Sequence, residues 1–116
     1  MENLKDYMLL FRMELKKDVQ PTANEIAQIK KSWQDWISQI GSKARLVSSY
    51  QLGFESNLLS HHSMPEPSSE KVESKFISGN MVLKAVDLRE ATEFAKGCPI
   101  LAAGGSVEVR NTLNAY

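Results

Sequence analysis

The chain has 116 residues, of which 42% are hydrophobic and 24% are charged, and its 14 Lys and Arg residues balance 14 Asp and Glu residues. This length and composition predict one globular domain over residues 1–116 and exclude a disordered or fibrous chain. The charges are scattered and no apolar run approaches the roughly 20 residues that cross a bilayer, so neither nucleic acid nor a membrane is an expected partner.

The first third of the chain predicts a strand followed by a long helix. Residues 7–13 alternate with large apolar side chains on both faces, which is typical of a strand covered on two sides. Thr22 and Glu25 form a capping box, in which each side chain reaches the other residue's backbone amide. Gly41 is expected to close this helix. Its apolar stripe, read as core, consists of Ile26, Ile29, Trp33, Trp36, Ile37 and Ile40.

A second strand is predicted over residues 44–52, after which Gly53 bends the chain. Residues 57–61 are expected to extend this strand into a short hairpin, and residues 62–71 have the composition of a loop. Alternation places one set of side chains on a common face: Leu46, Ser48, Tyr50 and Leu52.

The remaining elements are a strand, a short helix and a final strand. Residues 76–86 alternate, with a kink expected at Gly79, and Asp87 opens a second capping box with Glu90. A helix over residues 88–96 should turn Leu88, Ala91, Phe94 and Ala95 inward.

The helix is expected to stop at Gly97 in the left-handed conformation, and Pro99 prevents its continuation. After the turn signal of Gly104 and Gly105, residues 106–110 predict a strand with Val107 and Val109 on one face.

This order predicts an α+β fold, the ferredoxin-like plait (βαββαβ), with a four-stranded antiparallel sheet and two helices on one face. The other face is too apolar to remain exposed, because Met8 and Leu10 point to it. We therefore expect a second copy to cover it, giving a homodimer of the dimeric α+β barrel type.

Arg12 is the charge of greatest interest, because it ends an apolar strand and points to the face that a partner would cover. A desolvated guanidinium requires a carboxylate or phosphate, which is either the anionic group of a ligand or an internal partner such as Glu108 or Glu14. Tyr50 has two interpretations as well, a hydroxyl that orients a ligand or one bonded at an interface. Ser48, on the same predicted face, completes this candidate ligand-binding set.

The sequence predicts no metal site and no cofactor. His61 and His62 are adjacent and point to opposite sides of an extended chain, and no glycine-rich phosphate loop is present. Cys98 follows a helix C-terminus, which disfavours a thiolate, so a buried cysteine is the simpler interpretation. One cysteine forms no intrachain disulfide, and residues 1–12 lack the pattern of a signal peptide, which predicts a cytoplasmic protein.

Several segments resemble the YCII-related family, also called the DGPF-domain family. They are residues 7–12, 33–36, 79–84 and, most specifically, the block from Ala95 through the Cys98-Pro99 turn and the double glycine to Val107-Glu108-Val109-Arg110. The resemblance covers nearly the whole chain, and it implies a ferredoxin-like fold and dimerisation.

The resemblance also implies what the site would contain. Some family members resemble small lactone isomerases and dehalogenating enzymes with a His-Asp pair in a cleft. Here Asn24 stands at the histidine position and Cys98 at the aspartate position, while residues 68–71 replace the Asp-Gly-Pro-Phe signature. These departures place Asn24 and Cys98 in the candidate ligand-binding set and predict weak or lost isomerase or lyase activity.

Two functions follow as hypotheses. The first is a homodimer that binds a small, possibly anionic, organic molecule in a cleft between sheet and helices. The second is a regulatory or protein-interaction module, since the family resemblance implies an association with alternative sigma factors. A cleft with convergent polar groups favours the first, and a cleft filled by core side chains, with an exposed apolar patch elsewhere, favours the second.

Overall fold

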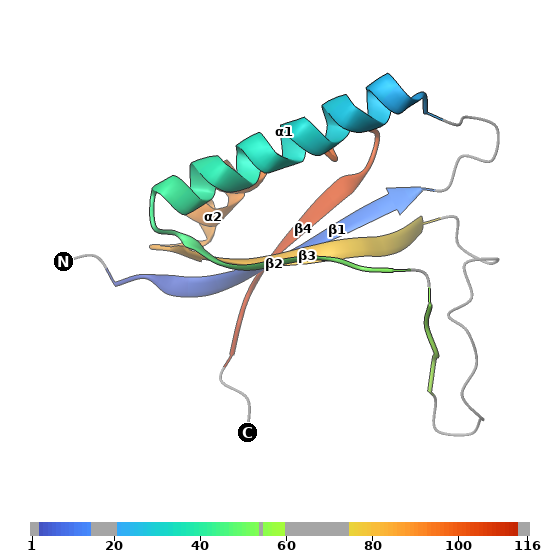
Figure 1. The fold of residues 1–116 in the computed structure, drawn as a ribbon. Coiled ribbons are helices and arrows are strands. Elements are labelled where there is room, and N and C mark those ends of the chain that lie inside the picture. Colours follow the sequence, from blue (N-terminus) through green and yellow to red (C-terminus); the bar gives the residue numbers. More distant parts are fainter. Residues whose placement is uncertain (1–2, 15–20, 54, 60–74, 114–116) are drawn as a thin grey trace.

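A computed structural model describes residues 3–14, 21–53, 55–59 and 75–113. Their elements are β1 (Lys5–Glu14), α1 (Ala23–Ser42), β2 (Leu46–Gln51), β3 (Lys75–Ala85), α2 (Leu88–Ala95) and β4 (Ser106–Asn111). The strands form one antiparallel sheet in the order β2-β3-β1-β4, and both helices lie on the same face of it (Figure 1). The α+β class and the order of elements are confirmed, and this strand order is compatible with the ferredoxin-like plait.

The core lies between the sheet and the helices. Along β1, Tyr7, Leu9 and Phe11 are buried beneath the helices, while the residues between them point to the opposite face. Leu9 lies opposite Met81 of β3 and Val109 of β4, so the central strands present apolar side chains in register. The predicted alternation of β1, β3 and β4 is therefore confirmed.

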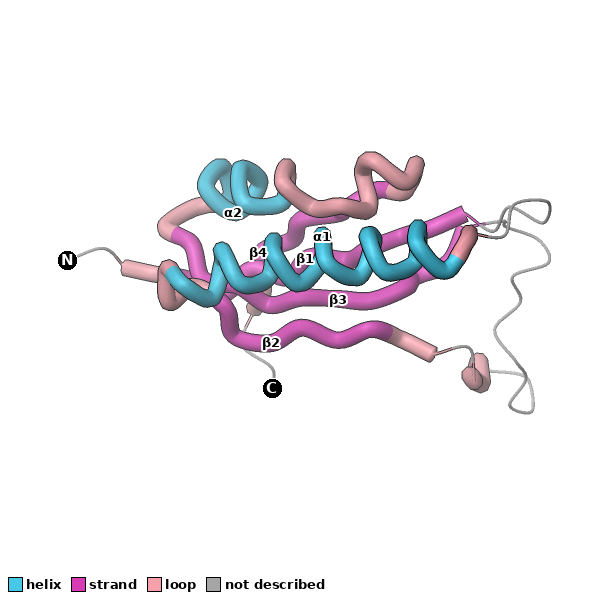
Figure 2. Tube along the Cα trace, turned by 45° about the horizontal axis from the view of Figure 1, so that its top comes forward, coloured by secondary structure: helices cyan, strands magenta, loops and turns pink. Residues whose placement is uncertain are grey.

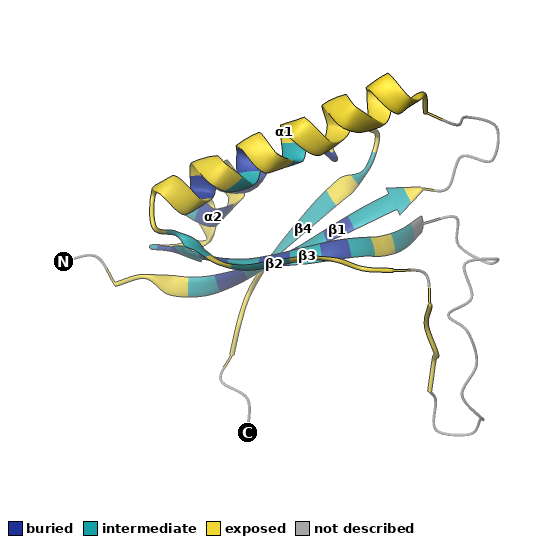
Figure 3. Cartoon of the chain, viewed as in Figure 1, coloured by how far each residue is buried: buried dark blue, intermediate teal, exposed yellow. Residues whose placement is uncertain are grey.

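Only the second half of the predicted stripe on α1 is packed. Trp36 and Ile40 are buried, but Ile26 and Ile29 remain 53% and 47% exposed. The reason is the tilt of the helix, because α1 rises away from the sheet toward its N-terminal end (Figures 1 and 3). Periodicity shows which side of a helix is apolar, but it does not show how far along that side the sheet reaches.

Helix α2 lies beside the C-terminal half of α1 above the sheet (Figure 2). Its Ala91 and Ala95 are buried as predicted and Phe94 is partly buried, but Leu88, in the first turn, is 50% exposed. The expectation that Leu88 faces the core was therefore wrong. The small size of the two buried alanines lets this short helix approach the sheet closely.

Both helices end differently from the sequence expectation. Gly41 lies inside α1, which continues to Ser42, and it is Ala44 that takes the left-handed conformation, with a φ of 56°. Gly97 follows α2 without a positive φ, since the last turn tightens through hydrogen bonds from Gly97 N to Phe94 O and from Cys98 N to Ala95 O. The residue after α2 that does take a positive φ, 87°, is Gly104, which precedes β4.

The N-terminal caps of both helices form, but the carboxylates of Glu25 and Glu90 do not bind the backbone amides of Thr22 and Asp87 as expected. Thr22 Oγ1 accepts from Glu25 N at 3.1 Å and also hydrogen-bonds the Glu25 carboxylate. Asp87 accepts from Glu90 N, and Glu90 reaches back one residue further, to Val86 N, at 3.0 Å. Both side-chain caps satisfy amides of the first helical turn that have no partner within the helix.

An irregularity in β2 changes which of its side chains share a face. Leu46 lies opposite Leu83, whereas Ser48 lies opposite Val82, so Val47 is the extra residue of a bulge. Leu46 consequently packs on the core side, while Ser48 and Tyr50 occupy the opposite face. The prediction that Leu46 and Tyr50 share a face was therefore wrong. The predicted loop at residues 62–71 lies outside the described residues.

Gly79 provides a test of the pairing between β2 and β3. A Cβ at Gly79 would lie 2.5 Å from the carbonyl oxygen of Tyr50, whereas a Cβ at Gly53 would meet nothing within 4 Å. We expect Gly79→Ala to lower the free energy of unfolding by about 1–3 kcal/mol, because β2 must shift, and Gly53→Ala to change it by less than about 0.5 kcal/mol. Urea unfolding of both variants at one protein concentration measures the difference, and equal effects would contradict the close approach.

Candidate functional site

The face of the sheet opposite the helices carries most of the predicted site residues. We call it the open face and define it by the residues that the strand register places there: Asp6, Met8, Leu10, Arg12, Glu14, Ser48, Tyr50, Ile77, Asn80, Val82, Lys84, Ser106, Glu108 and Arg110. No helix of the described part of the chain covers it (Figure 1). Its centre is apolar, with Met8, Leu10 and Val82 each partly buried by their neighbours.

Arg12 and Glu108 form an ion pair at one end of the open face. Arg12 Nη1 lies 2.5 Å from Glu108 Oε1, and both side chains remain about one-third exposed. Arg110 Nε lies 3.5 Å from the other oxygen of Glu108, so one carboxylate stands between two guanidinium groups. The internal partner predicted for Arg12 is thus present, and Glu14, the alternative partner, lies two residues along the same face of β1. A depression of about 40 Å³ beside Arg12 has room for about one water molecule.

Tyr50 and Ser48 lie on the same face but at its far edge. The register places Tyr50, Asn80, Leu10 and Glu108 in one row across the four strands. Strands are about 4.8 Å apart, so Tyr50 and Glu108 are separated by about 14 Å at their Cα atoms. Tyr50 is 65% exposed. Within one chain, therefore, the predicted binding residues form two separate groups rather than one site.

The other two predicted residues lie on the helical side of the sheet. Asn24 is exposed in the first turn of α1, and Cys98 is buried in the turn after α2. Burial raises the pKa of the Cys98 thiol from 9.0 to about 11, against a smaller opposite effect of a backbone hydrogen bond from Ile100. The protonated thiol is a poor nucleophile, so Cys98 is a packing residue in this fold.

The space between the sheet and the C-terminal half of α1 is filled by aromatic side chains. Phe11 lies edge to face with Trp33 and Trp36, at ring-centroid distances of 5.1 and 5.9 Å, and the two indoles are 5.7 Å apart. The expected cleft between sheet and helices is therefore occupied by core at this position.

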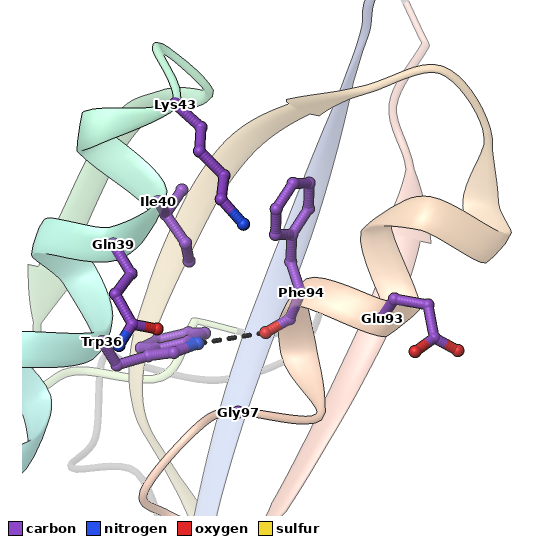
Figure 4. A pocket seen from close by; sticks show the side chains of 7 residues that line it. All are labelled: Trp36, Gln39, Ile40, Lys43, Glu93, Phe94 and Gly97. Atoms are coloured by element: carbon purple, nitrogen blue, oxygen red, sulfur yellow. Dashed lines mark hydrogen bonds between the residues drawn. The ribbon is translucent and has the colours of Figure 1, made fainter.

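A hollow that sequence reasoning did not anticipate lies between the two helices (Figure 4). It measures about 160 Å³ and is lined by Trp36, Gln39, Ile40 and Lys43 from α1 and its cap and by Glu93, Phe94 and Gly97 from α2 and the turn after it. The Trp36 indole donates to Phe94 O at 3.0 Å, and Lys43 Nζ lies 5.5 Å from the centre of the Phe94 ring. No local sequence signal indicates this hollow, because its two walls meet only through tertiary packing.

The described residues hold no group of three or more His, Cys, Asp or Glu side chains that could bind a metal ion. His61 and His62 lie outside these residues. Among the helices that the structure describes, none is both long and apolar enough to cross a membrane.

Neither a scan against protein-family models nor a search of curated proteins finds a match to this chain. The resemblance to the YCII-related family therefore rests on the residues quoted above.

The inert state of Cys98 predicts slow chemical modification. At about pH 8 the raised pKa lowers the thiolate fraction by about 100-fold and burial restricts access of the reagent, so the native protein should react with a disulfide reagent much more slowly than the unfolded chain. Leu101 is exposed in the same turn, so Leu101→Cys in a Cys98→Ala background is the matched control and should react rapidly. Native Cys98 labelling at the rate of this control would contradict the assignment.

Proposed function

We propose that two copies of this chain pair through the open face, giving a YCII-like homodimer of the dimeric α+β barrel type that acts as an interaction module, with weak or lost catalytic activity. The observation that carries the proposal is the arrangement of this face, an apolar centre with ion-paired ends. Met8, Leu10 and Val82 form the centre, and a symmetric dimer would bury the same patch from both copies.

Two ion pairs on the open face support this interpretation because each forms within one chain. Asp6 Oδ1 accepts from Lys84 Nζ at 3.0 Å at one end of the face, and Arg12 pairs with Glu108 at the other. Covering an unpaired charge costs far more than covering a hydrogen-bonded pair. A second copy can therefore approach this face without leaving these four charges unpaired.

Two groups support the loss of efficient catalysis. The Arg12 guanidinium is engaged by Glu108, and the Cys98 thiol is buried with a raised pKa. The aromatic filling of the space beneath α1 favours an interaction module over a cleft enzyme, as the sequence-based criterion required.

Solution mass tests the dimer. We expect the protein to have twice the mass of one chain by light scattering at micromolar concentration, and Leu10→Lys to have the mass of a monomer, because the substitution places an unpaired charge in the apolar centre. Leu101→Lys makes the same change at an exposed leucine off the sheet and should remain dimeric. A monomeric parent protein, or a dimeric Leu10→Lys variant, would refute pairing through this face.

A second candidate function is binding of a small organic anion at the dimer edge. The observation in its favour is that two guanidinium groups, those of Arg12 and Arg110, lie side by side at Glu108, where an anion could contact both. Tyr50 and Ser48 lie on β2, at the opposite edge of the sheet from β4. They would join this site only from the second copy, in a dimer whose two-fold axis places β2 of one copy beside Arg12 and Arg110 of the other.

Thermal unfolding with small carboxylates tests this second candidate. A ligand that prefers the native state raises the melting temperature in a saturable way, and Arg12→Ala should abolish the rise if Arg12 binds the anion. Arg89→Ala, which removes an exposed guanidinium on α2, is the control and should leave the rise intact. A rise that persists in Arg12→Ala would leave Arg12 with a structural role alone.

A further inference from the structure

We propose that the hollow between α1 and α2 binds a small planar organic anion, an aromatic carboxylate in its simplest form, with Lys43 as the charge partner. This site is separate from the open face and lies on the opposite side of the sheet, so it goes beyond the proposed function and does not depend on dimerisation.

The size and walls of the hollow suit a single ring. Its volume is about 160 Å³, and a cavity of about 150 Å³ holds one benzene molecule. Phe94 is the aromatic wall that is only partly buried, while Trp36 and Ile40 form the floor, with 5% and 2% of their surfaces exposed (Figure 4). Because the hollow opens to solvent, a polar substituent on the ring can keep part of its hydration.

The charge of the hollow is positive because one cation there lacks a carboxylate. Lys43 forms no ion pair with any described residue and lies over the Phe94 ring. The two other cations nearby are neutralised locally, since Arg45 pairs with Glu90 at 2.6 Å and Lys96 with Glu93 at 2.7 Å. An anion in the hollow therefore gains an interaction with Lys43 that no described side chain supplies.

Glu93 lines the hollow but does not make it a cation site. Its carboxylate points away from Phe94 and Lys43 (Figure 4) and is bound by Lys96. The hydrogen bond and charge of Lys96 lower the pKa of Glu93, so its negative charge is present at neutral pH but already matched.

Two features keep the hollow available to a ligand. The Trp36 indole N–H is satisfied by Phe94 O, so the small part of the residue that borders the hollow carries no unmet donor. Gly97 lets this indole lie against the turn after α2, because a Cβ there would be only 3.1 Å from Trp36 Cδ1. The aromatic wall is therefore held in place before a ligand arrives.

The test follows the two indole N–H signals of ¹⁵N-labelled protein by NMR during titration with sodium benzoate, with Trp33→Phe assigning them. We expect saturation of the Trp36 signal with a dissociation constant of the order of millimolar, as suits a ligand with so few atoms. Lys43→Gln should weaken binding by about ten-fold or more, and Lys43→Arg should retain it. Lys31→Gln, which removes an exposed charge elsewhere on α1, should have no effect.

Benzylamine has the ring without the negative charge, and acetate has the negative charge without the ring. Neither should saturate the Trp36 signal at millimolar concentration. The proposal is overturned if benzoate gives no saturable shift, if benzylamine binds equally well, or if Lys43→Gln binds with unchanged affinity. A benzoate shift lost in Arg12→Ala but kept in Lys43→Gln also overturns it and assigns the anion to the open face. The solution mass is measured separately, so failure here is distinguishable from failure of the homodimer.

Discussion

The fold depends on Trp36, which connects three elements through one side chain. Its ring packs edge to face against Phe11 of β1, and its indole N–H donates to the carbonyl of Phe94 in the last turn of α2. A buried N–H without a partner is costly, so the indole requires α2 to lie where this carbonyl can accept. The βαββαβ connectivity places both helices on one face of the sheet, and Trp36 joins them there.

The two faces of the sheet therefore differ. With both helices on one face, no helix among the described residues covers the opposite face of the sheet, which must be solvated or covered by something else. The open face is mixed in character. Charged side chains pair across neighbouring strands at its ends, and apolar side chains occupy its middle. Asp6 with Lys84 and Arg12 with Glu108 are cross-strand partners or near neighbours in register, so strand pairing brings the opposite charges together.

Local signals in the sequence predicted the elements well and their ends poorly. Alternation in β1, β3 and β4 and the Thr22 and Asp87 caps are properties of a few neighbouring residues, and the structure confirms them. The left-handed residue at the end of α1 is Ala44 rather than Gly41, because the path into β2 determines where the helix stops. The bulge at Val47 likewise arises from pairing with β3, which alternation within residues 44–52 does not reveal.

The contacts in the candidate sites also divide into those that local sequence signals predict and those that depend on tertiary packing. Arg12 could be paired with Glu108 from the sequence because both sit on outward positions of strands expected to be neighbours. The meeting of Lys43 with Phe94 could not, since it depends on the angle between two helices.

Trp36 also joins the two proposed surfaces. It lines the hollow between the helices, and it contacts Phe11, whose neighbours Leu10 and Arg12 point to the open face. Adjacent residues of a strand share backbone, so a shift of β1 caused by a partner on the open face would reach the indole through Phe11. Coupling between a ligand in the hollow and a partner on the open face would nevertheless require two discrete arrangements of the aromatic side chains, one favoured by the ligand and the other by the partner. The close packing of Phe11, Trp33 and Trp36 in edge-to-face contact opposes a second arrangement, and we therefore expect the two surfaces to bind independently.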